Sequence, residues 1–93
     1  MEQGTRVVIS IMGRNQVGIL AAVSKVLADH RVDIVDITQK IVDTLFLMMI
    51  VADIGPSNTS LDNLNKALRV PCGRLGLEVV AQHEKLFRYM HRV

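Results

Sequence analysis

The sequence has few of the residues on which several classes of protein depend. Aromatic residues make up 3% of the 93 residues, Cys72 is the single cysteine, and the longest apolar run spans only residues 45–52. One cysteine excludes an internal disulfide and fits a reducing compartment. The apolar run is far short of the roughly 20 residues that cross a bilayer. No secretion-signal pattern opens the chain, so we expect a soluble cytoplasmic protein with no membrane partner.

The chain also lacks a strong charge of either sign. It carries 11 Lys and Arg against 9 Asp and Glu, a net charge of +2. This excess is too small for a polyanion binder that works by charge alone. The scarcity of aromatics removes the stacking platforms on which nucleic-acid-binding sheets depend, since only Phe46 falls in a predicted strand. We therefore expect no nucleic-acid partner.

Aliphatic residues are abundant, and their spacing predicts four strands and two helices. Hydrophobic residues make up 49% of the chain. We expect strands over 5–12, 32–42, 45–54 and 77–83, and helices over 17–29 and from about 61 to 70, where Pro71 ends or kinks the second helix. A short amphipathic tail helix is expected over about 85–92.

Local signals refine these boundaries. Asn15, or with less support Gln16, is expected to cap the first helix, and Ser60 or Thr59 the second. We expect His30 to end the first helix in a left-handed conformation. Asp43 and Thr44 are expected to form a tight turn between the two central segments.

The order strand–helix–strand–strand–helix–strand is the ferredoxin-like split βαβ arrangement of the α/β class. It predicts an α+β sandwich, in which a four-stranded antiparallel sheet carries two helices on one face. Residues 1–93 are expected to form a single domain of this kind.

Both faces of the predicted sheet are apolar. Phe46, Met48 and Ile50 alternate with Leu47 and Met49 on the opposite face. Two helices bury only one of these faces, and an exposed apolar strand is an aggregation hazard. The pattern therefore predicts a homo-oligomer, either a dimer or a tetramer.

The segment between the first strand and the first helix is a candidate binding site. Gly13 and Gly18 bracket a turn whose backbone amides point outward at a helix N-terminus, a geometry that suits an anion or a carboxylate. Asn15 would cap the helix or contact a ligand through its amide. The alternative is that the glycines only permit the turn and Asn15 only caps, and the motif alone leaves both open.

These residues resemble the ACT-domain family. The Gly-x-x-x-x-Gly turn of residues 13–18, the following helix over 19–28 and the strand over 32–37 are similar to the start of an ACT domain. The resemblance continues through Gln82-His83-Glu84 and the tail over 87–92, as in a stand-alone ACT group of prokaryotic proteins. Asn15 departs from the family pattern, because many members have Asp there.

The resemblance implies a regulatory module that is not an enzyme and uses no cofactor. ACT domains commonly bind small molecules, often amino acids, at interfaces between paired domains. By position, the implied ligand-binding residues are Gly13, Asn15, Gln16, Val17, Gly18 and Ile19, together with Asp36 and Thr38 of the facing second strand. The regulated protein is not identified by the sequence. The alternative is a protein–protein interaction module that binds no ligand.

Other candidate sites carry weaker patterns. His83, Glu84 and His91 lack the spacing of a metal site. Cys72 has no His or acidic neighbour that would activate it. Asp33 and Asp36 are expected on opposite faces of their strand, so they do not form an acid–base pair. We therefore predict no catalytic and no metal-binding residue.

An enzyme on the same fold, such as an acylphosphatase-like hydrolase, has little support. It needs a phosphate cradle that bears an arginine and a positioned asparagine. Only Arg14 beside Asn15 offers these groups, without a matching turn.

Overall fold

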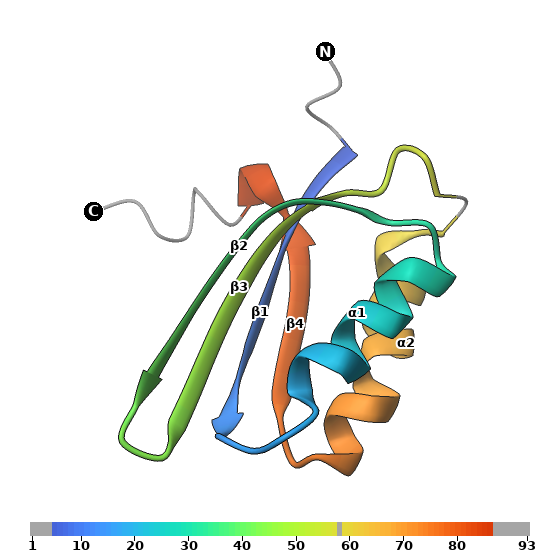
Figure 1. The fold of residues 1–93 in the computed structure, drawn as a ribbon. Coiled ribbons are helices and arrows are strands. Elements are labelled where there is room, and N and C mark those ends of the chain that lie inside the picture. The colour runs from blue at the N-terminus through green and yellow to red at the C-terminus, as the bar shows by residue number, and fades with distance from the viewer. Residues whose placement is uncertain (1–4, 58, 87–93) are drawn as a thin grey trace.

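The structure, a computed structural model, describes residues 5–57 and 59–86 and confirms the predicted ferredoxin-like fold. Its elements are β1 (Arg6–Arg14), α1 (Ile19–Asp29), β2 (Asp33–Val42), β3 (Leu45–Asp53), α2 (Leu61–Arg74) and β4 (Glu78–His83). The strands form one antiparallel sheet in the order β2-β3-β1-β4. Both helices lie on one face of this sheet, and the β2–β3 hairpin extends away from them (Figure 1).

The core lies between the helices and the helix-facing side of the sheet. Alternate residues of the central strands point into it, because successive strand side chains face opposite sides. Its largest fully buried side chains are Ile9, Ile11, Leu27, Ile50, Leu64, Leu68, Val7, Val23 and Cys72. The opposite side of the sheet, called here the open face, is not covered by either helix, and Met12 and Met49 are 48% and 39% exposed there. The prediction that both faces are apolar is confirmed.

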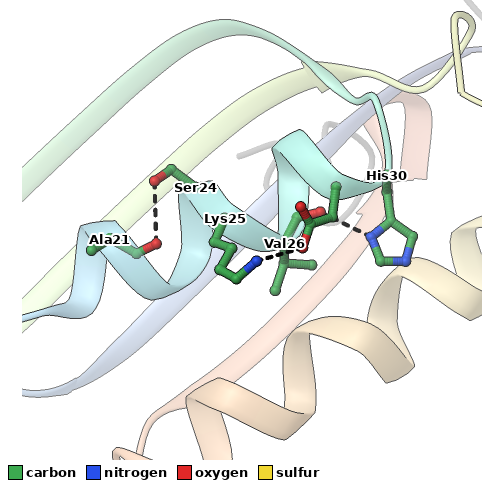
Figure 2. A network of polar contacts seen from close by, with 6 residues as sticks. Ala21, Ser24, Lys25, Val26 and His30 are labelled. Carbon is green, nitrogen blue, oxygen red and sulfur yellow. Dashed lines mark hydrogen bonds and ion pairs between the residues drawn. The ribbon is translucent and has the colours of Figure 1, made fainter.

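The end of α1 differs from the expectation. His30 has a φ of −98°, and the left-handed residue is Arg31, with a φ of 57°. His30 instead continues the helical pattern: its backbone N–H donates to the Val26 carbonyl, and its Nδ1 lies 2.9 Å from the same oxygen (Figure 2). The expected chain reversal therefore falls one residue later. The nearby Lys25–Asp29 ion pair of 3.0 Å is exposed and adds little stability.

Helix α2 continues through Pro71. Ser60 caps it as predicted, since its Oγ accepts a hydrogen bond from the Asn63 N–H at 3.1 Å. Pro71 removes one amide donor, but the next residue, Cys72, is fully buried in the core and holds the last turn in place. The helix therefore does not end near Val70; it continues past Pro71 and ends at Arg74, as the second expectation had it, without an assigned kink.

Beyond β4, residues 84–86 form a helical turn. Most of the predicted tail helix over 85–92 lies outside the described residues. Among those that the structure describes, no helix is long and apolar enough to cross a membrane.

A β-bulge in β2 corrects the predicted placement of two acidic residues. Ile34 pairs with Ala52 on the helix-facing side, but the next paired residue, Asp36, is opposite Val51 on the open face. The extra residue at the bulge shifts the alternation of the strand by one. Asp33 is opposite Asp53, which shares the open face with Val51, so the prediction that Asp33 and Asp36 face opposite sides is wrong.

One side chain on α2 binds the outer edge of β4 at a single residue, Ala81. Asn65 Nδ2 donates to the Ala81 carbonyl at 2.9 Å, and Asn65 Oδ1 accepts from the Ala81 N–H at 2.8 Å. Edge strands expose backbone groups of this kind to any additional strand. Asn65 therefore satisfies both edge groups of Ala81 from within the chain.

Substitution of Asn65 by Ala should reveal the importance of this contact. Both backbone groups of Ala81 lose a partner in a partly buried place, which should lower the free energy of unfolding by about 1–3 kcal/mol. Asn63→Ala, at an exposed position on the same helix, is the matched control and should change stability by less than about 0.5 kcal/mol. Urea denaturation measures both, and equal losses for the two variants would contradict this role.

Candidate functional site

The segment over residues 13–18, which is the end of β1 and the turn into α1, lies beside the β2–β3 hairpin and is held from two sides. The Asn15 N–H donates to the carbonyl of Thr44 in that hairpin at 2.8 Å. Gln16 Nε2 donates to the carbonyls of Arg14 at 3.0 Å and of Leu75 at 2.9 Å. Leu75 lies between α2 and β4, so Gln16 ties the turn to a distant part of the chain. Gln16 is one of the predicted ligand-binding residues, and its side-chain amide is therefore already occupied by hydrogen bonds that hold the turn.

Gly13 has a packing role. It lies within β1 opposite Phe46, whereas the sequence predicted that β1 would stop there. A Cβ at this position would lie 2.7 Å from Leu77 Cδ2 and 3.3 Å from Leu77 Cα. Both distances are shorter than ordinary van der Waals contact, so a Cβ at position 13 would have to displace Leu77, directly before β4. The packing at Gly13 therefore supports the alternative that this glycine serves the structure of the turn.

The N-terminus of α1 is open. Its N-cap is Gly18, with a φ of 94°, and no side chain among residues 5–57 and 59–86 accepts a hydrogen bond from the first amides. The expectation that Asn15 or Gln16 caps this helix is therefore wrong, because the helix begins at Ile19 and both residues lie outside its first turn. No acidic residue occupies the first turn of α1. The amides and the positive end of the helix dipole thus have no compensating side chain within the described part of the chain.

The surroundings of this helix start are accessible. Val17 is 96% exposed, and a Cβ built on Gly18 would meet no atom within 4 Å. Ile19, by contrast, is buried in the core at 3% exposure. The predicted turn residues therefore divide into two groups: Gly13, Gln16 and Ile19 support the structure, while Asn15, Val17 and Gly18 face solvent.

Asp36 and Thr38 lie apart from the turn within one chain. Both are exposed on the open face of β2, opposite Val51 and Met49. Thr38 is four residues from Val42, where β2 reaches the hairpin, which corresponds to about 13 Å along a strand. One copy of the chain therefore does not bring all the predicted site residues together.

A shallow apolar hollow of about 420 Å³ lies on the open face and crosses all four strands. Its open-face side chains are Ser10, Met12, Thr38, Lys40, Leu47, Met49, Glu78 and Val80. The sequence predicted the apolar character of this face through the alternation of its strands. Apart from Thr38, it did not identify the residues of a hollow, because these come together only through the pairing of β4 with β1.

The described residues offer little chemistry for catalysis or metal binding. In this part of the chain, no group of three His, Cys, Asp or Glu residues is placed to hold a metal ion. His91, one of the weak metal candidates, lies outside it. Burial raises the pKa of the Cys72 thiol, which keeps it protonated within the core.

Comparison with known proteins identifies the family. The ACT domain family matches residues 5–82, nearly the whole of the described chain. The chain belongs to this family. It is 43% identical over 89 residues to a UPF0237 protein of Methanocaldococcus jannaschii, covering 96% of this chain and 99% of the relative. It is 34% identical over 86 residues to a UPF0237 protein of Neisseria meningitidis, covering 92% and 96%.

A solved structure agrees with this assignment. An ACT domain protein from Streptococcus pneumoniae superposes with a TM-score of 0.76 at 26% identity, covering 88% of this chain and 92% of that one. The ACT fold and the UPF0237 relatives therefore confirm the resemblance drawn from the turn, the second strand and the tail.

Two glycines of this ACT domain should respond to alanine with opposite signs. Gly13→Ala forces a Cβ against Leu77 and should lower the free energy of unfolding by about 1–3 kcal/mol. Gly73→Ala lies within α2, where an added Cβ meets no atom within 4 Å, and should raise it by about 0.5–1 kcal/mol through helix propensity. Chemical denaturation distinguishes the two, and a stable Gly13→Ala protein would refute the packing role.

Proposed function

We propose that this ACT domain is a non-enzymatic regulatory module that senses an amino acid or a similar carboxylate-bearing metabolite at an interface between copies of the chain. The observation that carries the proposal is the N-terminus of α1, which has no acidic residue in its first turn and no side-chain cap from any residue that the structure describes. Free amides at a helix N-terminus bind carboxylates through hydrogen bonds and the helix dipole.

The exposed part of the turn defines the ligand-facing groups. The backbone amides around Gly18 and Ile19 would bind the carboxylate, and the exposed Asn15 amide would donate to it or accept from an ammonium group. The glycine at position 18 leaves space directly above the helix start. The part of the ligand that binds at the start of α1 is therefore anionic.

A second copy would complete the site. Within one chain, Asp36 and Thr38 are too far along β2 to reach the turn, yet both are exposed on an edge strand. An adjacent copy would bring its own β2 toward the turn. Oligomerisation and ligand binding are thereby coupled, which is the basis of regulation by a metabolite.

A second candidate function is supported by the hollow on the open face. Large apolar side chains such as Met12, Met49 and Val80 are 39–48% exposed there. Contiguous apolar surface of this kind marks protein interaction sites. Under this alternative, the domain binds a partner protein and no small ligand.

Thermal unfolding against a panel of the twenty amino acids tests the sensing function. We expect at least one amino acid to raise the melting temperature at concentrations above its dissociation constant. Val17→Asp should weaken binding of that ligand at least 10-fold, because an aspartate beside the helix start repels the carboxylate and occupies the positive end of the dipole.

Val17→Asn is the matched control, since it has the same shape without the charge and should bind nearly as the parent does. The position is 96% exposed, and an acidic residue near a helix N-terminus stabilises the helix. Loss of binding in Val17→Asp therefore cannot be attributed to unfolding. If no amino acid of the panel raises the melting temperature of the parent protein, the ligand-free interaction module is favoured instead.

A further inference from the structure

The open face of the sheet is organised in rows that run across the strands, because residues directly opposite each other in antiparallel strands share a face. One row, called here the charged row, consists of Lys40 in β2, Leu47 in β3, Met12 in β1 and Glu78 in β4. It passes through the hollow. The row therefore has a cation at one edge of the sheet, an anion at the other edge and two apolar side chains between them.

Apolar side chains continue on both sides of the charged row. In these rows and in the charged row, the large apolar side chains that are 39–50% exposed are Met12, Val42, Leu45, Met49 and Val80. The row beyond Met49 contains Val8, which is buried at 3% exposure. The exposed apolar surface is therefore centred on the charged row, on the side of the sheet that both helices leave free (Figure 1). Contiguous surface of this kind marks interaction sites.

A second copy of the chain complements the charged row. Two sheets that pack face to face keep their strands nearly aligned, with the sheets about 10 Å apart. A two-fold axis that runs along the strands, between β1 and β3, places β2 of each copy over β4 of the other and β1 over β3. Lys40 of each copy then lies over Glu78 of the other, and Met12 lies over Leu47.

The same charges disfavour the other two-fold arrangement of two stacked faces. An axis that runs along the charged row, perpendicular to the strands, places each strand over its own copy. Lys40 would then lie over Lys40 of the second copy, and Glu78 over Glu78. Like charges that face each other across an interface oppose association. Charge therefore selects the axis that runs along the strands.

We propose that the open face binds the open face of a second copy, with the two-fold axis along the strands, so that the apolar rows pack together and two Lys40–Glu78 ion pairs form at the edges. Each copy presents the same surface, so the contact closes on itself as a dimer. Burial of the apolar rows provides the affinity, and the ion pairs at the rim set the orientation.

This contact gives the hollow of the second candidate function its partner, and it does not rest on ligand sensing at the turn. It uses the face of the sheet and leaves the edge of β2 free along its length. It is therefore compatible, in one assembly, with the approach of β2 that would complete the ligand site.

Zero-length cross-linking of the parent protein tests the orientation. A carbodiimide joins a lysine amine to a carboxylate only when the two groups are in contact. Within one chain, Lys40 and Glu78 are three strand spacings apart, about 14 Å between Cα atoms, with Leu47 and Met12 between them. We expect a mixture of unlabelled and isotope-labelled protein to give a Lys40–Glu78 amide that joins a labelled to an unlabelled peptide, as read by mass spectrometry. Absence of this mixed amide would overturn the proposal.

Charge reversal measures the contribution of the two ion pairs. Lys40→Glu and Glu78→Lys each place like charges over one another twice and should weaken self-association about 10-fold in sedimentation equilibrium. The double variant Lys40→Glu/Glu78→Lys restores both pairs with their signs exchanged and should recover most of the affinity. Lys66→Glu is the charge-matched control, because the Lys66 side chain is 70% exposed on α2, and its dissociation constant should equal that of the parent. Failure of the double variant to recover would contradict the orientation.

A second pair of variants tests the apolar rows. Met12 on the open face and Leu20 on α1 are each 48% exposed. Met12→Asp places a carboxylate at the centre of the contact and should weaken self-association at least 10-fold, whereas Leu20→Asp lies in the helix layer and should not. Equal effects of the two variants would count against the open face as the contact.

No amino acid is added in these experiments, so their outcome is separate from that of the ligand panel. The mixed Lys40–Glu78 amide together with a panel that raises no melting temperature would keep the contact and remove the sensing function. A ligand-responsive protein without the mixed amide would keep the sensing function and remove the contact. A parent chain that sediments as a monomer at high concentration would also overturn the inference and leave the hollow to a different protein.

Discussion

The packing of both helices on one side of the sheet is the constraint on which the rest of this structure depends. It fixes a core of aliphatic side chains and leaves much of the other face of the same sheet exposed among the residues that the structure describes. In a small domain the buried core provides only marginal stability. Burial of the exposed apolar surface would therefore add stability only when the chain associates with another molecule.

Under the proposed function, the turn before α1 would serve both structure and recognition. Gly13, Gln16 and Ile19 hold it against Leu77, Leu75 and the core, and this rigidity presents the first amides of α1 in a fixed direction. A site preorganised in this way loses little entropy when a ligand binds. The residues that do not contact a ligand are therefore as necessary to the site as the exposed ones.

Much of this arrangement could be predicted from the sequence, because strands and helices leave periodic patterns. The order of elements, the Ser60 cap, the Asp43-Thr44 turn and the two apolar faces all follow from local spacing. The bulge at Val35 could not be predicted. Both faces of β2 carry apolar and polar residues, so no break in an alternating pattern marks the extra residue. Nor could the Gly18 cap, because Asn15 is an equally good capping residue by type.

Long-range side-chain contacts also could not be predicted from the sequence. In the sequence, Asn65 is an ordinary polar residue of α2. Only the packing of β4 beside this helix shows its two hydrogen bonds to the backbone of Ala81. Gln16 is similar, because its bond to the Leu75 carbonyl joins residues 59 positions apart. No pattern within a short window carries information of this kind.

The bond from Gln16 to Leu75 has a mechanical consequence. Leu75 directly precedes the segment that enters β4, and β4 contributes Glu78 and Val80 to the hollow on the open face. Under the proposed function, a ligand that moved the turn at Gln16 would also move Leu75, which leads into the strand that lines this hollow. A single amide side chain would transmit occupancy at the turn to the face where another protein could detect it.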